Sequence, residues 1–110
     1  MGAFVKGDVV VVPFPFSDLS ESKRRPALVV GNLSGDDVIL CQITSQATND
    51  RYAIPLEDQD FAKGTLQRPS NIRPNRLFTA DSNIVRYKAG NLTREKIEEA
   101  TEAIIDILRA

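Results

Sequence analysis

Residues 22–31 read SKRRPALVVG, and this stretch decides how the rest of the chain is interpreted. Three cations, Lys23, Arg24 and Arg25, precede a proline, and an apolar run follows at residues 27–30. Because proline fixes φ and restricts the residue before it to extended backbone, the pattern predicts a strand over residues 27–31 with Arg25 on its stiff entry. An arginine held in this way suits phosphate recognition, because its planar guanidinium donates hydrogen bonds in pairs. The alternative is a solvated basic loop that keeps a strand edge soluble.

The composition predicts one small globular domain over residues 1–110. A hydrophobic content of 42% and a charged content of 26% allow a single modest core. The net charge of −1 gives the whole protein no attraction to nucleic acid. The chain has 14 cations and 15 anions, of which three cations and five anions lie in residues 93–110. Residues 1–92 therefore carry a slight net positive charge. The single cysteine, Cys41, fits a reducing cytoplasm, and no signal pattern or membrane-spanning run is present.

The periodicity predicts a mainly β fold. Residues 9–12 are four valines and indicate a buried strand, which we expect to end at Pro13 and Pro15 because prolines cannot donate to a ladder. Residues 17–24 indicate a polar loop, and a hairpin turn at Ser34-Gly35-Asp36 joins the strand over 27–31 to one over 38–44. Shorter extended pieces are predicted over 51–56, 65–72, 77–79 and 84–87, with a turn at 73–76.

One helix is predicted to begin after Thr93. Thr93 can cap the first turn, and Leu92 with Ile97 has the spacing of a hydrophobic staple. An apolar stripe opposite a Glu-rich face consists of Ile97, Ala100, Ile104, Ile107 and Leu108. We therefore expect a small, partly open, SH3-like barrel of five to seven strands, closed at one end by a C-terminal helix.

A second polar signal lies at the end of the strand over 38–44, in the segment Gln42-Ile43-Thr44-Ser45-Gln46. Antiparallel pairing around Gly35 would bring Arg25 and Thr44, nineteen residues apart, to the same end of the hairpin. The alternative is that Thr44 and Ser45 only cap the strand and hydrogen-bond their own loop.

These motifs resemble those of the MazF/PemK toxins of type II toxin–antitoxin systems. The resemblance rests on residues 7–10, 13–15, 23–30 and 42–46, and it extends in layout through the closing helix. It implies a small homodimeric barrel that cuts single-stranded RNA, such as mRNA, at short sequences without a metal or cofactor and is neutralised by an antitoxin. It further implies that Arg25 is the catalytic arginine, Thr44 the catalytic hydroxyl, and residues 17–24 a gate over the groove. Three basic residues stand where many members have a Gly-rich stretch, so the base preference stays open.

The chemistry fits the residues present. The chain has no histidine, which excludes imidazole as acid, base or metal ligand. Attack by a ribose 2′-hydroxyl needs only positioning and charge stabilisation, for which Arg25 offers two donors and Thr44 one. Arginine titrates far above neutral pH, so we assign Arg25 to electrostatic stabilisation rather than proton transfer. Candidate substrate contacts by stacking or charge are Phe16, Lys23, Arg24, Arg73 and Arg76. The resemblance further implies that Ser45 and Gln46 lie beside the scissile phosphate or an adjacent base.

Two other functions are considered. A toxin of related fold could bind a protein such as DNA gyrase without catalysis, and it would not need Arg25 beside Thr44. A degenerate relative could serve only as an interaction module, but the intact motifs count against it. As partners we expect a second copy of the chain, because Leu77 and Phe78 would be exposed on a barrel this small, and an acidic antitoxin tail attracted to the cationic groove.

Overall fold

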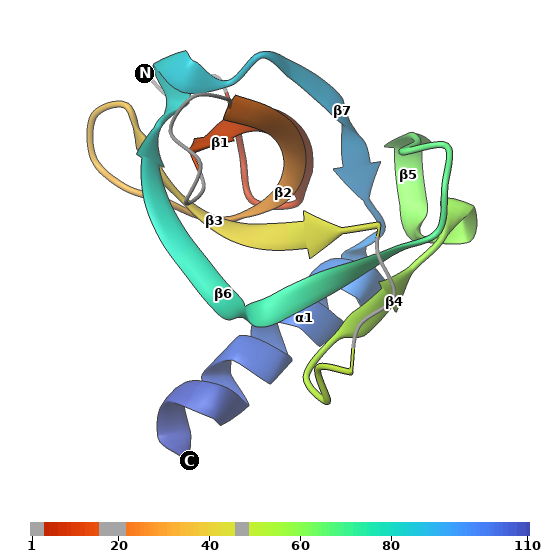
Figure 1. Ribbon diagram of the computed structural model, residues 1–110. Coiled ribbons are helices and arrows are strands. Elements are labelled where there is room, and N and C mark those ends of the chain that lie inside the picture. The colour runs from red at the N-terminus through yellow and green to blue at the C-terminus, as the bar shows by residue number, and fades with distance from the viewer. Residues whose placement is uncertain (1–3, 16–21, 46–48) are drawn as a thin grey trace.

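Seven antiparallel strands curl into a half-barrel, and one helix follows them (Figure 1). The computed structural model describes residues 4–15, 22–45 and 49–110. The strands are β1 (Asp8–Pro15), β2 (Ser22–Asn32), β3 (Asp37–Thr44), β4 (Ile54–Leu56), β5 (Phe61–Gly64), β6 (Ser70–Asp81) and β7 (Tyr87–Leu92), with short helical turns η1 (Asp58–Asp60) and η2 (Ser82–Ile84) and the helix α1 (Arg94–Arg109). They lie in the order β4-β6-β3-β2-β1-β7-β5, which confirms the predicted mainly β fold with a C-terminal helix.

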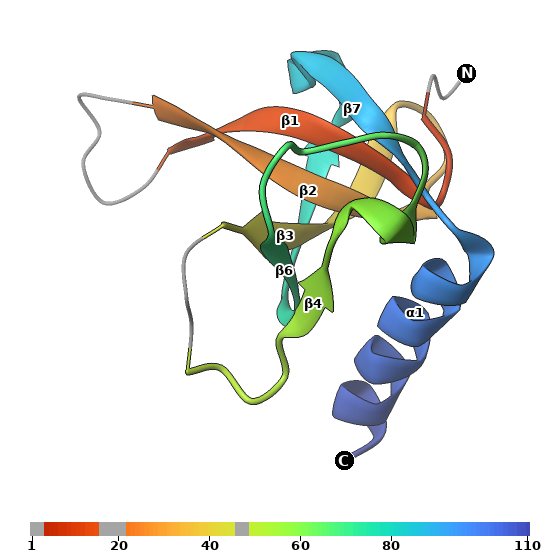
Figure 2. The same ribbon diagram turned by 90° about the vertical axis from the view of Figure 1, so that its right-hand side faces the viewer.

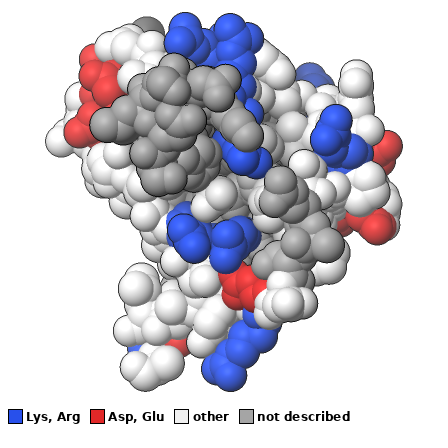
Figure 3. Space-filling view, in the orientation of Figure 1, with Lys and Arg blue, Asp and Glu red and all other residues white. Residues whose placement is uncertain are grey.

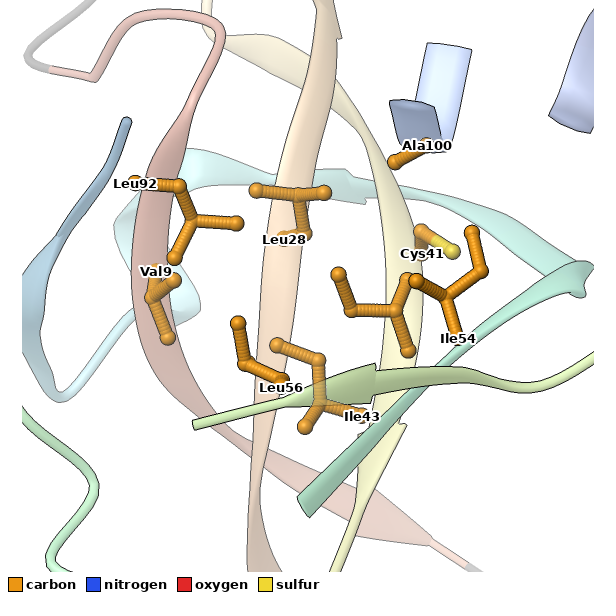
Figure 4. Packing of buried hydrophobic residues seen from close by; sticks show 9 residues of the cluster. Val9, Leu28, Cys41, Ile43, Ile54, Leu56, Leu92 and Ala100 are labelled. Carbon is orange, nitrogen blue, oxygen red and sulfur yellow. The ribbon is translucent and has the colours of Figure 1, made fainter. Parts of the chain in front are cut away.

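The valine run is buried on both faces of β1. Val9 joins one apolar cluster with Leu28, Cys41 and Ile43, whereas Val10 and Val12 join a second cluster. In the first cluster, side chains from the six strands β1, β2, β3, β4, β6 and β7 and from Ala100 of α1 point into a common interior (Figure 4). Each fully buried leucine or isoleucine in such a cluster contributes about 1.5–3 kcal/mol. These clusters hold the strands at fixed positions around the open end of the barrel.

Helix α1 is anchored at its start. The Thr93 hydroxyl accepts a hydrogen bond from the Lys96 amide at 3.3 Å, which confirms the predicted cap. Ala100 is fully buried in the first cluster, and Ile97 packs against it. The predicted stripe is wrong at its end: Leu108 is 72% exposed, and the C-terminal end of α1 projects away from the strands (Figure 2). In the described part of the chain, no helix is long and apolar enough to cross a bilayer.

Strands β1 and β2 are longer than the sequence predicted. Pro13 and Pro15 pair with Arg24 and Ser22, so the expected loop over 17–24 gives way to strand at Ser22. The carbonyl of Val11 accepts a hydrogen bond from the Arg86 amide, so the backbone polar groups of Val11 face the β7 side. Because these groups point to alternate sides along a strand, the nitrogens of Pro13 and Pro15 face the β7 side as well. The two prolines therefore lack their N–H groups on an edge of β1 that β7 does not reach. The ladder between β1 and β2 loses no hydrogen bond.

The predicted turn at residues 73–76 is also wrong, because it is a bend within β6. Cys41 pairs with Leu77 and Ile43 with Ile72, so β6 carries an irregularity opposite β3 that accommodates Pro74. Figure 1 shows β6 changing direction at this point. The bend lets one strand pair with β3 along both of its halves and with β4 at its start.

Candidate active site

The ladder between β2 and β3 stops at Pro26. Pairing runs from Asn32 with Val38 to Ala27 with Gln42. Because the polar backbone groups of Val11 face β7, those of its partner Pro26 face β3, where proline has no hydrogen to donate. Beyond this point Ile43 and Thr44 pair with β6, as the earlier residues of β3 also do. A cavity lies at this end of the ladder, lined in part by residues of both strands.

This cavity has a volume of about 520 Å³, within the roughly 300–1,000 Å³ range of small-ligand sites. Its apolar lining comes from Val11, Pro26, Ile43 and Leu66, and its polar lining from Arg24, Arg25, Ser45, Arg68, Ser70 and Tyr87. None of these lining residues, all in the described part of the chain, is acidic. Three guanidinium groups on one cavity favour an anionic ligand.

Arg25 and Thr44 lie at the same end of the hairpin, as the spacing predicted. Extending the β2–β3 register by two positions puts them level with each other. Arg25 is half-buried, its Nε is buried, and it lines the cavity. Thr44 is only 8% exposed and stands between Ile43 and Ser45, which both line the cavity. A partly desolvated guanidinium interacts with an anion more strongly than one in bulk water.

The other predicted contacts divide into three groups. Arg24 and Ser45 line the cavity with Arg25. Arg76 is exposed on β6 and, like Arg73, is not among the residues that line the cavity. Phe16, Gln46 and residues 17–21 of the gate predicted over 17–24 lie outside the described residues, and of Lys23 only the backbone is described, in β2. Figure 3 shows Lys and Arg side chains in several patches over the face toward which these strand ends point.

Four residues of the cavity were not predicted from the sequence: Leu66, Arg68, Ser70 and Tyr87. One signal was available, since Arg68-Pro69 repeats the Arg-Pro pair of residues 25 and 26. Tyr87 enters the site because β7 returns beside β1 and pairs it with Val11. That pairing joins residues far apart in sequence, and no local pattern predicts it.

Arg73 pairs with Asp50 rather than lining the cavity. Its Nε and Nη2 each lie 3.1 Å from Asp50 Oδ2, and the Tyr52 amide donates to Oδ1 at 2.9 Å. The ion pair fastens Asp50 to strand β6.

The amide of Tyr52 and, with it, the Arg73 guanidinium hold the pKa of the Asp50 carboxyl below its ordinary value of 3.8. The lowered folded-state pKa means that this carboxylate stabilises the fold above the ordinary value and loses that effect as pH falls through the lowered one. We expect Asp50→Asn to reduce the free energy of unfolding by the same amount from pH 5 to 7. The difference from the parent should shrink below about pH 4. Urea titrations of both proteins measure it, with Asp106→Asn on the exposed face of α1 as control; a constant difference down to pH 2 would contradict the assignment.

Cys41 takes no part in this chemistry. It is fully buried, its Sγ lies 3.0 Å from the Arg73 carbonyl oxygen, and burial raises its pKa to about 12. The thiol is therefore protonated at neutral pH and is no nucleophile. Within the described residues, no group of three or more His, Cys, Asp or Glu side chains is placed to hold a metal ion.

Comparison with known proteins gives one family and one fold. A family model described as PemK-like, MazF-like toxin of type II toxin–antitoxin system matches residues 5–108. No curated protein sequence shows significant similarity to the chain.

Several solved structures share its architecture. An endoribonuclease in complex with its cognate antitoxin, from a mycobacterial species, has a TM-score of 0.74 at 15% identity, over 96% of this chain and 95% of that one. The Mycobacterium tuberculosis toxin MazF-mt6 has a TM-score of 0.72 at 16% identity, over 93% and 96%. MazF from Deinococcus radiodurans has a TM-score of 0.70 at 19% identity, over 96% of each chain. At these identities the likeness shows the fold.

Proposed function

Because the chain belongs to the PemK-like, MazF-like toxins of type II toxin–antitoxin systems, we propose that it is an endoribonuclease that cuts single-stranded RNA at a short sequence in the cytoplasm. The observation that carries this proposal is the cavity at the end of the β2–β3 ladder. It combines three arginines, two serine hydroxyls and an apolar floor, with no acid among its described lining residues. Phosphate groups with attached bases match this lining in charge and in polarity.

The proposed reaction uses the ribose 2′-hydroxyl as nucleophile. Its oxygen bonds to the adjacent phosphorus, the bond from phosphorus to the 5′-oxygen breaks, and the products are a 2′,3′-cyclic phosphate and a 5′-hydroxyl. The 2′-proton leaves to water, and the departing 5′-oxygen takes a proton from water. Arg25 would stabilise the charge that develops on the phosphorane oxygens, and Thr44 would add one neutral donor. Both roles need fixed positions, which the residue before Pro26 and the end of a paired strand provide.

Incubating a long RNA with the purified protein in EDTA tests this function. Discrete fragments with 2′,3′-cyclic phosphate and 5′-hydroxyl ends are expected, since the reaction draws on no metal. Intact RNA would contradict the proposal. Intact RNA together with inhibition of supercoiling by DNA gyrase would favour the non-catalytic toxin instead.

We also propose that the chain forms a two-fold homodimer and binds an acidic antitoxin segment. Leu77 and Ile84 are 38% and 40% exposed, as apolar residues at an interface between copies would be. An acidic segment would be drawn to the cationic cavity, and its binding should weaken as salt rises. Light scattering at micromolar concentration is expected to give twice the monomer mass of 12.1 kDa. A monomer mass would contradict the dimer.

A further inference from the structure

Tyr87 is the most exposed aromatic side chain among those described, at 55%. It begins β7, whereas later residues of that strand, Gly90 and Leu92, are buried. Within residues 4–15, 22–45 and 49–110 its ring has no aromatic or cationic partner and its hydroxyl no hydrogen bond. A tyrosine that lines a cavity without packing into the core offers a flat apolar face to whatever enters.

Arg68 stands on the same cavity and is held by its own turn. Pro69 restricts it to extended backbone, as Pro26 does for Arg25. Gln67 before it has a positive φ of 64°, and its amide donates to the Thr65 hydroxyl at 2.9 Å. That hydroxyl donates in turn to Asp58 at 2.6 Å. The described residues give the Arg68 guanidinium no ion pair. Its charge therefore stays available to a ligand.

The sheet order sets the distance across the site. Val11 pairs with Tyr87 on one side and with Pro26 on the other. Two strand spacings of about 4.8 Å place the Tyr87 backbone roughly 10 Å from that of Pro26. A base that neighbours the phosphate held at Arg25 falls within this span.

From this arrangement we infer that Tyr87 and Arg68 form a nucleotide subsite of the RNA-binding cavity. Tyr87 stacks on one base next to the scissile phosphate, and Arg68 pairs with a phosphate of the same strand. The inference rests on the proposed function, because it assigns to this subsite the nucleotide next to the scissile phosphate of the RNA. An acidic peptide would also be drawn to the arginines, but it gives an exposed aromatic face nothing to stack on.

A binding cycle tests the pair. The probe is a nine-nucleotide, fluorescein-labelled RNA with 2′-O-methyl groups, centred on the cleavage site mapped in the long RNA, with each base in turn replaced by an abasic residue. If the parent cuts nothing, oligo(A) and oligo(U) of the same length replace it. For the parent, one abasic position beside the cut should raise Kd about five- to 150-fold, the range that corresponds to 1–3 kcal/mol of stacking. Tyr87→Ala should raise Kd for the intact RNA by the same factor. For this variant, the abasic residue at that position should raise Kd no further.

Conservative and remote variants separate stacking from structure. Tyr87→Phe should bind like the parent, because the ring is kept. Arg68→Gln should reduce the magnitude of the slope of log K against the logarithm of the salt concentration by about 0.7. That is the value expected for the loss of one phosphate contact to single-stranded RNA. Tyr52→Ala and Arg109→Gln remove an exposed tyrosine and a cation elsewhere, and they should leave binding unchanged.

Each contrary outcome has one meaning. If the parent cuts RNA while Tyr87→Ala binds every probe like the parent, the subsite is wrong and the proposed function stands. The subsite is equally wrong if Tyr87→Ala weakens the intact and abasic probes by the same factor. A polyglutamate peptide serves as a second probe. If Tyr87→Ala binds RNA like the parent but binds this peptide more weakly, the surface serves an acidic partner instead. A parent that binds the probes without cutting contradicts the proposed cleavage alone, and one that binds none overturns both.

Discussion

Replacing Arg25 with alanine is expected to reduce RNA cleavage by a factor on the order of 10²–10³, the usual loss when one well-placed donor to a developing negative charge is removed. Arg25 is half-buried on the cavity, so its charge acts where water screens it less. Arg25→Lys should also lose most of the activity, because a lysine keeps the charge but not the paired donors. Single-turnover rates on the mapped RNA measure both effects.

The control for Arg25 is its neighbour across the hairpin. Thr44→Val keeps the buried β-branched shape and deletes the hydroxyl, and it should lower the rate less than Arg25→Ala because a neutral donor contributes less. Combining the two changes should cost less than the product of the single losses, since both groups act on one phosphate. If Arg25→Ala melts like the parent and cuts at the parent rate, the assignment of residues 22–31 to catalysis is wrong.

Gly90→Ala is expected to lower the free energy of unfolding by about 2 kcal/mol or more, near the upper part of the range for overpacking. A Cβ at this position would overlap the Lys63 carbonyl oxygen and stand 3.0 Å from the Cα of Gly64. Backbone atoms cannot swing aside as a side chain can, so β5 must move away from β7. Urea unfolding measures the loss, and RNA cleavage should fall with it, because β5 leads into the turn that carries Leu66 and Arg68.

Gly31→Ala is the matched control, also a glycine within a strand. Its new Cβ would meet Ile39 at ordinary contact distances of 3.6–3.9 Å. Its stability should change by no more than about 1 kcal/mol in either direction. Equal losses for the two variants would show that the close approach of β5 and β7 carries no special cost.

Local patterns predicted the fold where neighbours in sequence are neighbours in structure. The four valines, the turn at Gly35 and the cap at Thr93 each act within a few residues, and the structure has the strand, hairpin and helix that they indicated. The hairpin also brought Arg25 and Thr44 to the same end, and an irregularity between Val29 and Gly31 shifts the register by one residue so that the two are level.

The sequence failed where contacts join distant segments. Arg73 looked like a substrate contact, but its partner Asp50 lies 23 positions earlier and meets it only after β6 has paired with β3 and β4. The turn expected at 73–76 became a bend because β3 holds both halves of β6. Tyr87 reached the site through the pairing of β7 with β1. None of these outcomes has a local signal in composition or periodicity.

The cavity lies where the β2–β3 ladder ends, next to a proline nitrogen that has no hydrogen to donate. The ladder end is a feature of the backbone, and three of the polar side chains around it lie outside the core. Arg24, Ser45 and Arg68 can therefore be varied together in a selection library without closing the site or emptying the core, since none of them belongs to either apolar cluster. Such an architecture separates the evolution of target choice from the maintenance of the fold.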